Sequence, residues 1–275
     1  MLKLWCGVLF LWVASVLQAE TPLHIELVSG AKSIQPGKPF YLALSLVHGR
    51  GYHTYWKHPG IVGVPTSIQW SEVPKGFRMG DVQWPEPERT FMFKIKAQGY
   101  DRDVVLPILV TPPQDLLPGS SVTFKGLASW MCCADSCHPG FAKLEITLPV
   151  SAEPGEPSRW QRMIDKELGR PVEESSAWKT QVQLSKKEAV VTVIPQQGAR
   201  PLKPKDVEKL IYFTEDGVID TDKPQGMELQ ADGSLIIRLV RADAVAGGFN
   251  GRLSGVLVRE GGWQVDGKVR AMRVR

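Results

Sequence analysis

Three of the four cysteines of this chain, Cys132, Cys133 and Cys137, lie within six positions, in the stretch SWMCCADSCHPGF. Thiols this close together can form a disulfide that exchanges with the thiols of other proteins. The same sulfur atoms, together with the neighbouring His138, could instead bind a soft metal ion. Because three is an odd number, any pairing leaves one thiol over, and the spacing must indicate which one.

The spacing favours a bond between Cys133 and Cys137. In an extended strand their Cα atoms would be about 13 Å apart, whereas a disulfide needs them closer than about 7 Å. The chain must therefore reverse between them, and the intervening residues, ADS, are typical of a turn. A hairpin with a three-residue loop would place Cys133 opposite Cys137.

Strand alternation makes Cys132 the cysteine left over, because neighbouring side chains on a strand point to opposite faces. A bond between Cys132 and Cys133 would need a strained ring, and a bond between Cys132 and Cys137 would need a distorted loop. We expect Cys132 to be a small buried apolar residue. Closing so short a loop stabilises the fold by only about 2 kcal/mol. The predicted disulfide could therefore either stiffen the turn or react with another protein's thiolate.

Polar neighbours could tune these thiols. A cationic His138 would favour the thiolate of Cys137 and lower its pKa, but a histidine at a turn can also simply face solvent. Asp135 would oppose thiolate formation or accept a proton. The segment GYHTYWKHPG holds His53 and His58 among aromatic residues, and we interpret it as a connection packed on the domain that could line the approach to the cysteines.

A copper or zinc site is the alternative hypothesis for the same cluster. Its candidate ligands are Met131, Cys132, Cys133, Cys137 and His138. The alternation of side chains along a strand argues against it, because adjacent residues point apart. A third interpretation is an interaction module in which the disulfide is inert.

The elements that must position the cluster are short strands separated by proline and glycine. They occupy LHIELVSG, PFYLALSLVHG, PTSIQWSEV, FMFKIKAQGY, DVVLPILVTPP, SVTFKGLASW and FAKLEITLPV. Alternating apolar residues with turn signals at this spacing predict an immunoglobulin-like β-sandwich over residues 20–150.

A polar linker and a second β domain follow. Residues 151–158, SAEPGEPS, have the composition of a linker. A helix is predicted from Ser158, which could form a capping box with Gln161, and its apolar stripe is expected to pack on a sheet. The strand-like remainder predicts a second β-sandwich over residues 159–275, so the fold class is all-β with one short helix.

The N-terminus, MLKLWCGVLFLWVASVLQA, is typical of a secretory signal peptide over residues 1–19, with Lys3 before an apolar run. An uncleaved anchor is the alternative, although the run is short for a membrane span. We therefore expect an exported, periplasmic protein, in a compartment where disulfides persist. The formal charge of +4 is spread without a basic run, which argues against nucleic acid as a partner.

Several motifs resemble the N-terminal periplasmic domain of the transmembrane thiol:disulfide interchange reductases, the DsbD family, and most closely its copper-tolerance branch, the ScsB type. These motifs are HTYWKHPGIVGVPTSIQW, GYDRDVVLPILVTPP, WMCCADSCHPGFAKLEITLPV and, near the end, GRLSGVLVREGGWQVDGKVRAMRV. The resemblance implies a carrier of reducing equivalents on an immunoglobulin-like fold, without a cofactor, connected with cytochrome c biogenesis or copper tolerance.

The resemblance also implies roles for individual residues. Cys137 would form the mixed disulfide and Cys133 would resolve it. An aromatic cap loop would cover the pair around Phe91 to Phe93, before Tyr100. The electron donor would be a membrane-embedded thiol reductase, and the acceptors exported thioredoxin-like or disulfide isomerase proteins. The chain departs from the family in having three residues rather than five between the cysteines, and it has no thioredoxin-like CxxC motif, so we expect it to need other proteins to complete the relay.

Overall fold

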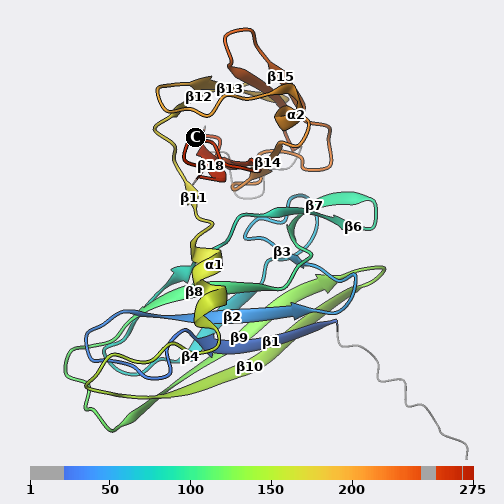
Figure 1. The fold of residues 1–275 in the computed structure, drawn as a ribbon. Coiled ribbons are helices and arrows are strands. Elements are labelled where there is room, and N and C mark those ends of the chain that lie inside the picture. The colour runs from blue at the N-terminus through green and yellow to red at the C-terminus, as the bar shows by residue number, and fades with distance from the viewer. Residues whose placement is uncertain (1–21, 243–251, 268) are drawn as a thin grey trace, which may run out of the picture.

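The computed structural model describes residues 22–242, 252–267 and 269–275, and shows two β domains joined by a short helix (Figure 1). Strands in several sheets dominate, which confirms the predicted all-β, immunoglobulin-like class. The predicted signal peptide, residues 1–19, lies outside the described residues. Within the described part of the chain, no helix is long and apolar enough to cross a membrane.

The first domain is a sandwich of two sheets with a third, smaller sheet at one end. One sheet has the order β1 (Leu23–Ser29), β2 (Phe40–His48), β8 (Val104–Thr111), β5 (Arg78–Val82). The facing sheet has the order β10 (Cys137–Pro149), β9 (Ser121–Cys133), β4 (Ser67–Glu72). The third has the order β3 (Thr54–Tyr55), β7 (Ile95–Tyr100), β6 (Glu88–Met92).

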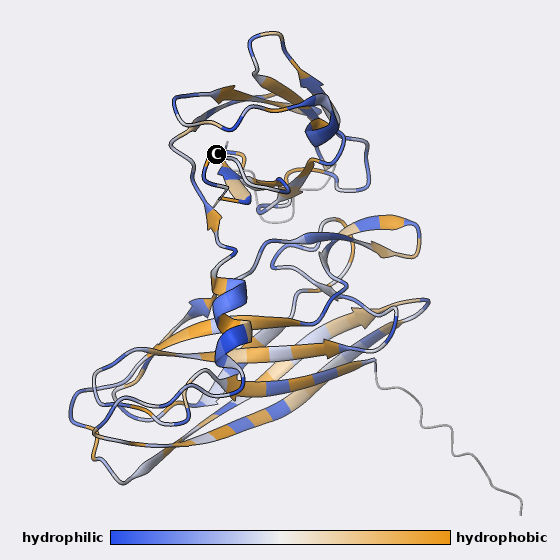
Figure 2. Ribbon diagram, viewed as in Figure 1, coloured by the Kyte–Doolittle hydropathy of each residue, from blue (hydrophilic) through white to orange (hydrophobic). Residues whose placement is uncertain are grey.

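Side-chain alternation explains how these sheets pack. Apolar and polar residues alternate along β10, so that only one face of its sheet turns to the core (Figure 2). Strand β2 is instead buried on both faces. Leu42, Leu44 and Leu46 of β2 point into the sandwich core, while the small Ala43 lies on the outer face, beneath the helix.

The helix α1 (Gln161–Leu168) covers that outer face. Ile164 is buried against Val28, Ala43 and Val105, and the other members of the predicted apolar stripe pack around it. The stripe is thus confirmed, and the sheet that it covers belongs to the first domain. The predicted capping box between Ser158 and Gln161 is wrong, because no such box begins the helix.

The reason lies in what the Ser158 hydroxyl contacts. It donates to the carbonyl oxygen of Ser29 and accepts the N–H of Trp160 at 3.0 Å. The Gln161 side chain turns instead to Asp165 Oδ1, at 2.6 Å. Ser158 is therefore hydrogen-bonded to the end of β1, and the helix begins at Gln161 with no side-chain cap.

The second domain is a pair of four-stranded sheets. One has the order β11 (Val172–Glu173), β18 (Ala271–Val274), β17 (Gly255–Val258), β14 (Ile211–Thr214). The other has the order β12 (Trp178–Leu184), β13 (Glu188–Pro195), β16 (Leu235–Val240), β15 (Gly226–Leu229), with the short helix α2 (Pro204–Val207) beside it.

The second domain rests on the β3–β7–β6 sheet of the first (Figure 1). The Gln98 amide, in β7, donates to the carbonyl oxygens of His58 and Thr214 at 2.6 and 2.9 Å and accepts the N–H of Thr214 at 2.7 Å. Lys57 pairs with Glu215 at 2.6 Å. Buried hydrogen bonds and an ion pair therefore link the small sheet of the first domain to the second domain.

Candidate functional site

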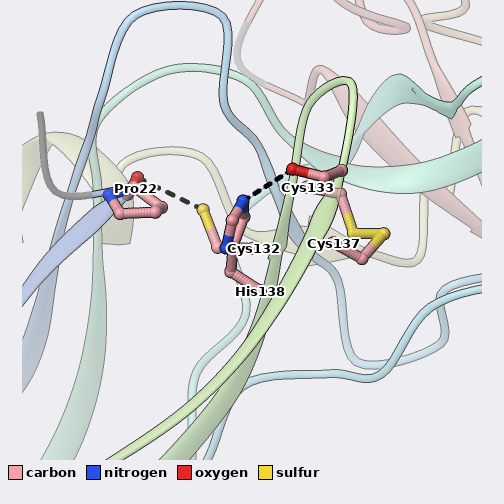
Figure 3. The surroundings of a disulfide bond; sticks show 6 residues. Pro22, Cys132, Cys133, Cys137 and His138 are labelled. Carbon is pink, nitrogen blue, oxygen red and sulfur yellow. Dashed lines mark hydrogen bonds between the residues drawn. A yellow bond between two sulfur atoms is a disulfide. The ribbon is translucent and has the colours of Figure 1, made fainter. Parts of the chain in front are cut away.

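The cysteine cluster forms a disulfide at the tip of the β9–β10 hairpin (Figure 3). Cys133 and Cys137 are direct cross-strand partners, with Cα atoms 4.1 Å apart, and three residues form the loop between them. The N–H of Ala134 donates to the carbonyl oxygen of Ser136 at 3.0 Å, which closes the loop. The pairing that the spacing predicted is confirmed.

The backbone of Cys133 explains why this pair is so close. Its N–H donates to the carbonyl oxygen of His53 at 3.0 Å, and its own carbonyl accepts the N–H of His53 at 2.9 Å. Both groups therefore point away from Cys137, which makes Cys133 and Cys137 a non-hydrogen-bonded pair. Pairs of this kind have the shorter Cα spacing in antiparallel sheets, about 4.5 Å, and their side chains lie closer together.

The two sulfur-bearing residues differ in exposure. Cys133 is fully buried, whereas Cys137 is partly exposed at the start of β10. Around them lies an apolar cluster of Tyr55 and Ala97, with Val62, Met92 and Met131 at its edge. A thiolate from another protein would therefore reach Cys137 before Cys133, because an attacking sulfur must approach the bond from solvent.

Cys132 lies on the opposite face of β9, as strand alternation predicted. It is fully buried in the core of the sandwich, and its thiol donates to the carbonyl oxygen of Pro22 at 3.3 Å. Burial raises the pKa of the Cys132 thiol to about 12. It is therefore protonated at neutral pH and is a poor nucleophile, because the thiolate is the reactive form.

His138 lies on the same face as Cys132, because the two are cross-strand partners, and so it points away from the disulfide (Figure 3). Its Nε2 is 2.8 Å from Ser136 Oγ, and its ring meets the edge of Tyr52 with centroids 5.7 Å apart. This geometry does not support the predicted influence of His138 on the Cys137 thiolate. Asp135 is exposed in the loop.

The ligands of the alternative metal site are separated by the same alternation. Cys132 and His138 face one side of the hairpin, and Cys133 and Cys137 are bonded to each other on the other side. Across residues 22–242, 252–267 and 269–275, no group of three or more histidine, cysteine or acidic side chains could hold a metal ion.

The β6–β7 hairpin contributes Met92 to the disulfide cluster, rather than the phenylalanines expected there. Phe91 and Phe93 are 49% and 63% exposed. Phe91 precedes Met92 on β6, so when Met92 turns toward the cysteines Phe91 turns toward solvent. Phe93 lies in the turn that follows β6, where its φ is positive (56°). Tyr100 is also away from the site: it is fully buried in the sandwich core, and its hydroxyl donates to the carbonyl oxygen of Pro85 at 3.0 Å.

Two further residues of the site, His53 and Tyr55, come from the aromatic segment that the sequence placed near the cysteines. They share one face of the chain and contact each other edge to face, with ring centroids 5.2 Å apart. Burial lowers the pKa of His53 and raises that of Tyr55 to about 12. The His-x-Tyr spacing in a strand-like segment was the signal that could have identified the pair.

Comparison with known proteins agrees with this geometry. The family described as "Thiol:disulfide interchange protein DsbD, N-terminal" matches residues 26–149. No curated protein matches the chain. The crystal structure of the N-terminal periplasmic domain of ScsB from Proteus mirabilis is similar, with 21% identity over 89% of this chain and 90% of that chain and a TM-score of 0.60.

Another structure, a protein of unknown function from Porphyromonas gingivalis W83, has 10% identity over 92% of this chain and 97% of that chain, with a TM-score of 0.25, too low to support an argument. The ScsB likeness supports the fold over both domains. The family match covers the strands that carry the disulfide. Residues 26–149 therefore belong to the DsbD N-terminal family of thiol:disulfide interchange domains.

Proposed function

We propose that this protein passes reducing equivalents through Cys133 and Cys137 to disulfides in exported proteins of the periplasm. The observation that carries the proposal is the disulfide itself, which joins a fully buried sulfur to a partly exposed one at the tip of a hairpin. A bond across so short a loop adds little stability, so a staple is the weaker explanation for it.

The difference in exposure between the two sulfur atoms supports the following order of steps. In the reduced protein, the Cys137 thiolate attacks one sulfur of the partner's disulfide, and the other partner sulfur leaves as a thiolate that takes up a proton. Cys133 then loses its proton and attacks the Cys137 sulfur. The bond between Cys137 and the partner breaks, the second partner thiol is released, and two electrons have passed to the partner.

The partners that the family resemblance implies suit this chemistry. A membrane-embedded thiol reductase would reduce the pair again, and exported thioredoxin-like or disulfide isomerase proteins would accept the electrons. The apolar N-terminal segment supports export, and so does the likeness to a domain of ScsB that is itself periplasmic.

The test compares three serine variants, expressed in cells and analysed on non-reducing gels. Cys133→Ser should accumulate covalent complexes that dithiothreitol dissolves, because no thiol is left to resolve them. Cys137→Ser should trap little, because it lacks the attacking thiol. Cys132→Ser is the matched control, since its buried thiol faces the core, and it should behave as the unmodified protein.

Two outcomes would contradict the proposal. If Cys132→Ser alone trapped complexes, the working pair would be Cys132 and Cys137, and the roles assigned above would be wrong. If no variant trapped a partner, the bond would be structural and the proposed relay would fail.

A further inference from the structure

His53, Cys133 and Cys137 form a row across three neighbouring strand segments. His53 is bridged to Cys133 on one side, and Cys133 pairs with Cys137 on the other. Directly opposed residues in antiparallel pairs project their side chains to the same face, with Cβ atoms about 4.5–5.5 Å apart. The imidazole of His53 therefore lies on the same face as the disulfide, across from Cys133 on the side away from Cys137.

One ring nitrogen of this imidazole is buried without a hydrogen-bond partner among the described residues. His53 is only 5% exposed, and its Nε2 has no hydrogen-bond partner among the described residues. The hydroxyl of Tyr55, in the same cluster as Cys133, is likewise buried without a partner. Buried polar atoms without partners are unusual, and they call for an explanation.

Reduction of the disulfide supplies that explanation. A disulfide sulfur has no proton to donate, whereas a reduced Cys133 has a thiol proton and, after losing it, a buried negative charge. Burial without a partner would raise the pKa of that thiol and slow its attack. A neutral base beside it would remove the proton as the sulfur attacks.

We propose that His53 is the proton acceptor for Cys133 in the step that resolves the mixed disulfide, an assignment that rests on the proposed function. The Cys133 proton passes to Nε2 of His53 while the Cys133 sulfur bonds to the Cys137 sulfur. The partner's sulfur leaves as a thiolate and is protonated by the imidazolium or by water, so that His53 returns to its neutral form.

The surroundings of His53 suit this role. Burial lowers its pKa, so the ring is neutral and able to accept a proton at neutral pH. Asp101 acts on the His53 ring and favours its imidazolium form. His53 in turn lowers the pKa of the nearby His48, which burial has already brought down to about 4, so His48 is neutral at neutral pH. Tyr55 meets its ring edge to face. Asp101 would stabilise the imidazolium once it forms.

His138 provides a matched comparison. It is also an imidazole, and it follows Cys137 directly in the sequence. Its cross-strand partner is Cys132, so it faces the other side of the hairpin and bonds to Ser136. Sequence proximity would favour His138 as the base, and strand geometry favours His53.

The experiment measures the pKa of Cys133 directly, in the full chain with Cys137→Ser and ¹³C-labelled cysteine, by following the Cys133 Cβ resonance against pH. His53→Phe keeps an aromatic ring and removes both nitrogens. It should raise the Cys133 pKa by about one unit, which corresponds to roughly tenfold less thiolate at a given pH. His138→Phe should leave the Cys133 titration unchanged.

A second measurement needs no substitution. In the unmodified protein, the ¹⁵N resonances of the His53 ring should shift when dithiothreitol reduces the disulfide, and those of His138 should stay in place. An unchanged Cys133 pKa in a folded His53→Phe variant would overturn the proposal, and so would a His53 ring that does not respond to reduction. Neither measurement involves a partner protein, so a failure here is distinct from a failure of the trapping experiment.

Discussion

Replacing Gln98 by alanine should loosen the junction between the two domains. The Gln98 side chain is buried and makes three hydrogen bonds, one to the His58 carbonyl and two to the backbone of Thr214 in the other domain. A hydrogen bond contributes about 1 kcal/mol net, and a buried group left without a partner costs about 1–3 kcal/mol. We therefore expect Gln98→Ala to lower the free energy of unfolding by about 3 kcal/mol.

Gln225 offers a matched control inside the second domain. Its side chain makes the same kind of paired contact, donating to the Tyr212 carbonyl at 2.8 Å and accepting the Tyr212 N–H at 2.9 Å. Gln225→Ala should cost about 2 kcal/mol through these two bonds, without touching the junction.

The assay is urea denaturation followed by tryptophan fluorescence and by circular dichroism. Gln98→Ala should separate the unfolding of the two domains, so that the two probes no longer coincide. Gln225→Ala should destabilise the second domain and leave the contacts between the two domains intact. A loss below 1 kcal/mol in Gln98→Ala, or an equal separation of the probes in both variants, would refute the reasoning.

Three further predictions concern the first domain. Cys132→Ala should keep the disulfide and lower the free energy of unfolding by about 1 kcal/mol through lost packing. In the unmodified protein, peptide mass spectrometry should find that iodoacetamide modifies Cys132 only after unfolding, and rapid modification of native Cys132 would contradict its burial. Gly63→Ala should lower the free energy of unfolding, measured in urea, by about 2 kcal/mol more than Gly119→Ala does. Both glycines have positive φ, but only a Cβ at Gly63 would overlap the Tyr55 ring. Equal losses would mean that the overlap is relieved at no cost. Burial lowers the pKa of His48 from 6.5 to about 4, so the unfolded chain binds the proton first and the protein loses stability as pH falls from 6.5 to 4. His48→Gln should remove up to about 3 kcal/mol of that loss, measured by urea unfolding at several pH values. An unchanged pH profile would mean that other groups cause the loss.

The disulfide could be predicted from the sequence because the information is local. Three turn residues and the alternation of β9 are enough to pair Cys133 with Cys137 and to turn Cys132 into the core. The register of a hairpin is set by its own loop, so no distant part of the chain is needed to establish it.

The residues around the disulfide could not be assigned in this way. Phe91 and Met92 lie on opposite faces of β6, and which face meets the cysteines depends on how β6 and β7 pack against β9. The docking of α1 is equally non-local, since Ile164 packs on Val28 and Ala43, more than a hundred positions earlier. A helical stripe shows that a face is buried, and tertiary packing determines what covers it.

Strand β10, which carries Cys137, lies at the edge of its sheet: β9 pairs with it on one side, and on the other side the N–H of Ile34 donates to the carbonyl oxygen of Pro149 at the end of the strand. An edge of thirteen residues is a template on which a second copy of the chain could add a strand and begin to aggregate. Pro139 and Pro149 lie near its two ends and have no N–H to offer such a strand. Lys143 and Glu145 lie between them, and charged side chains disfavour edge-to-edge pairing. The edge strand that carries the partly exposed Cys137 therefore resists growing into a fibre.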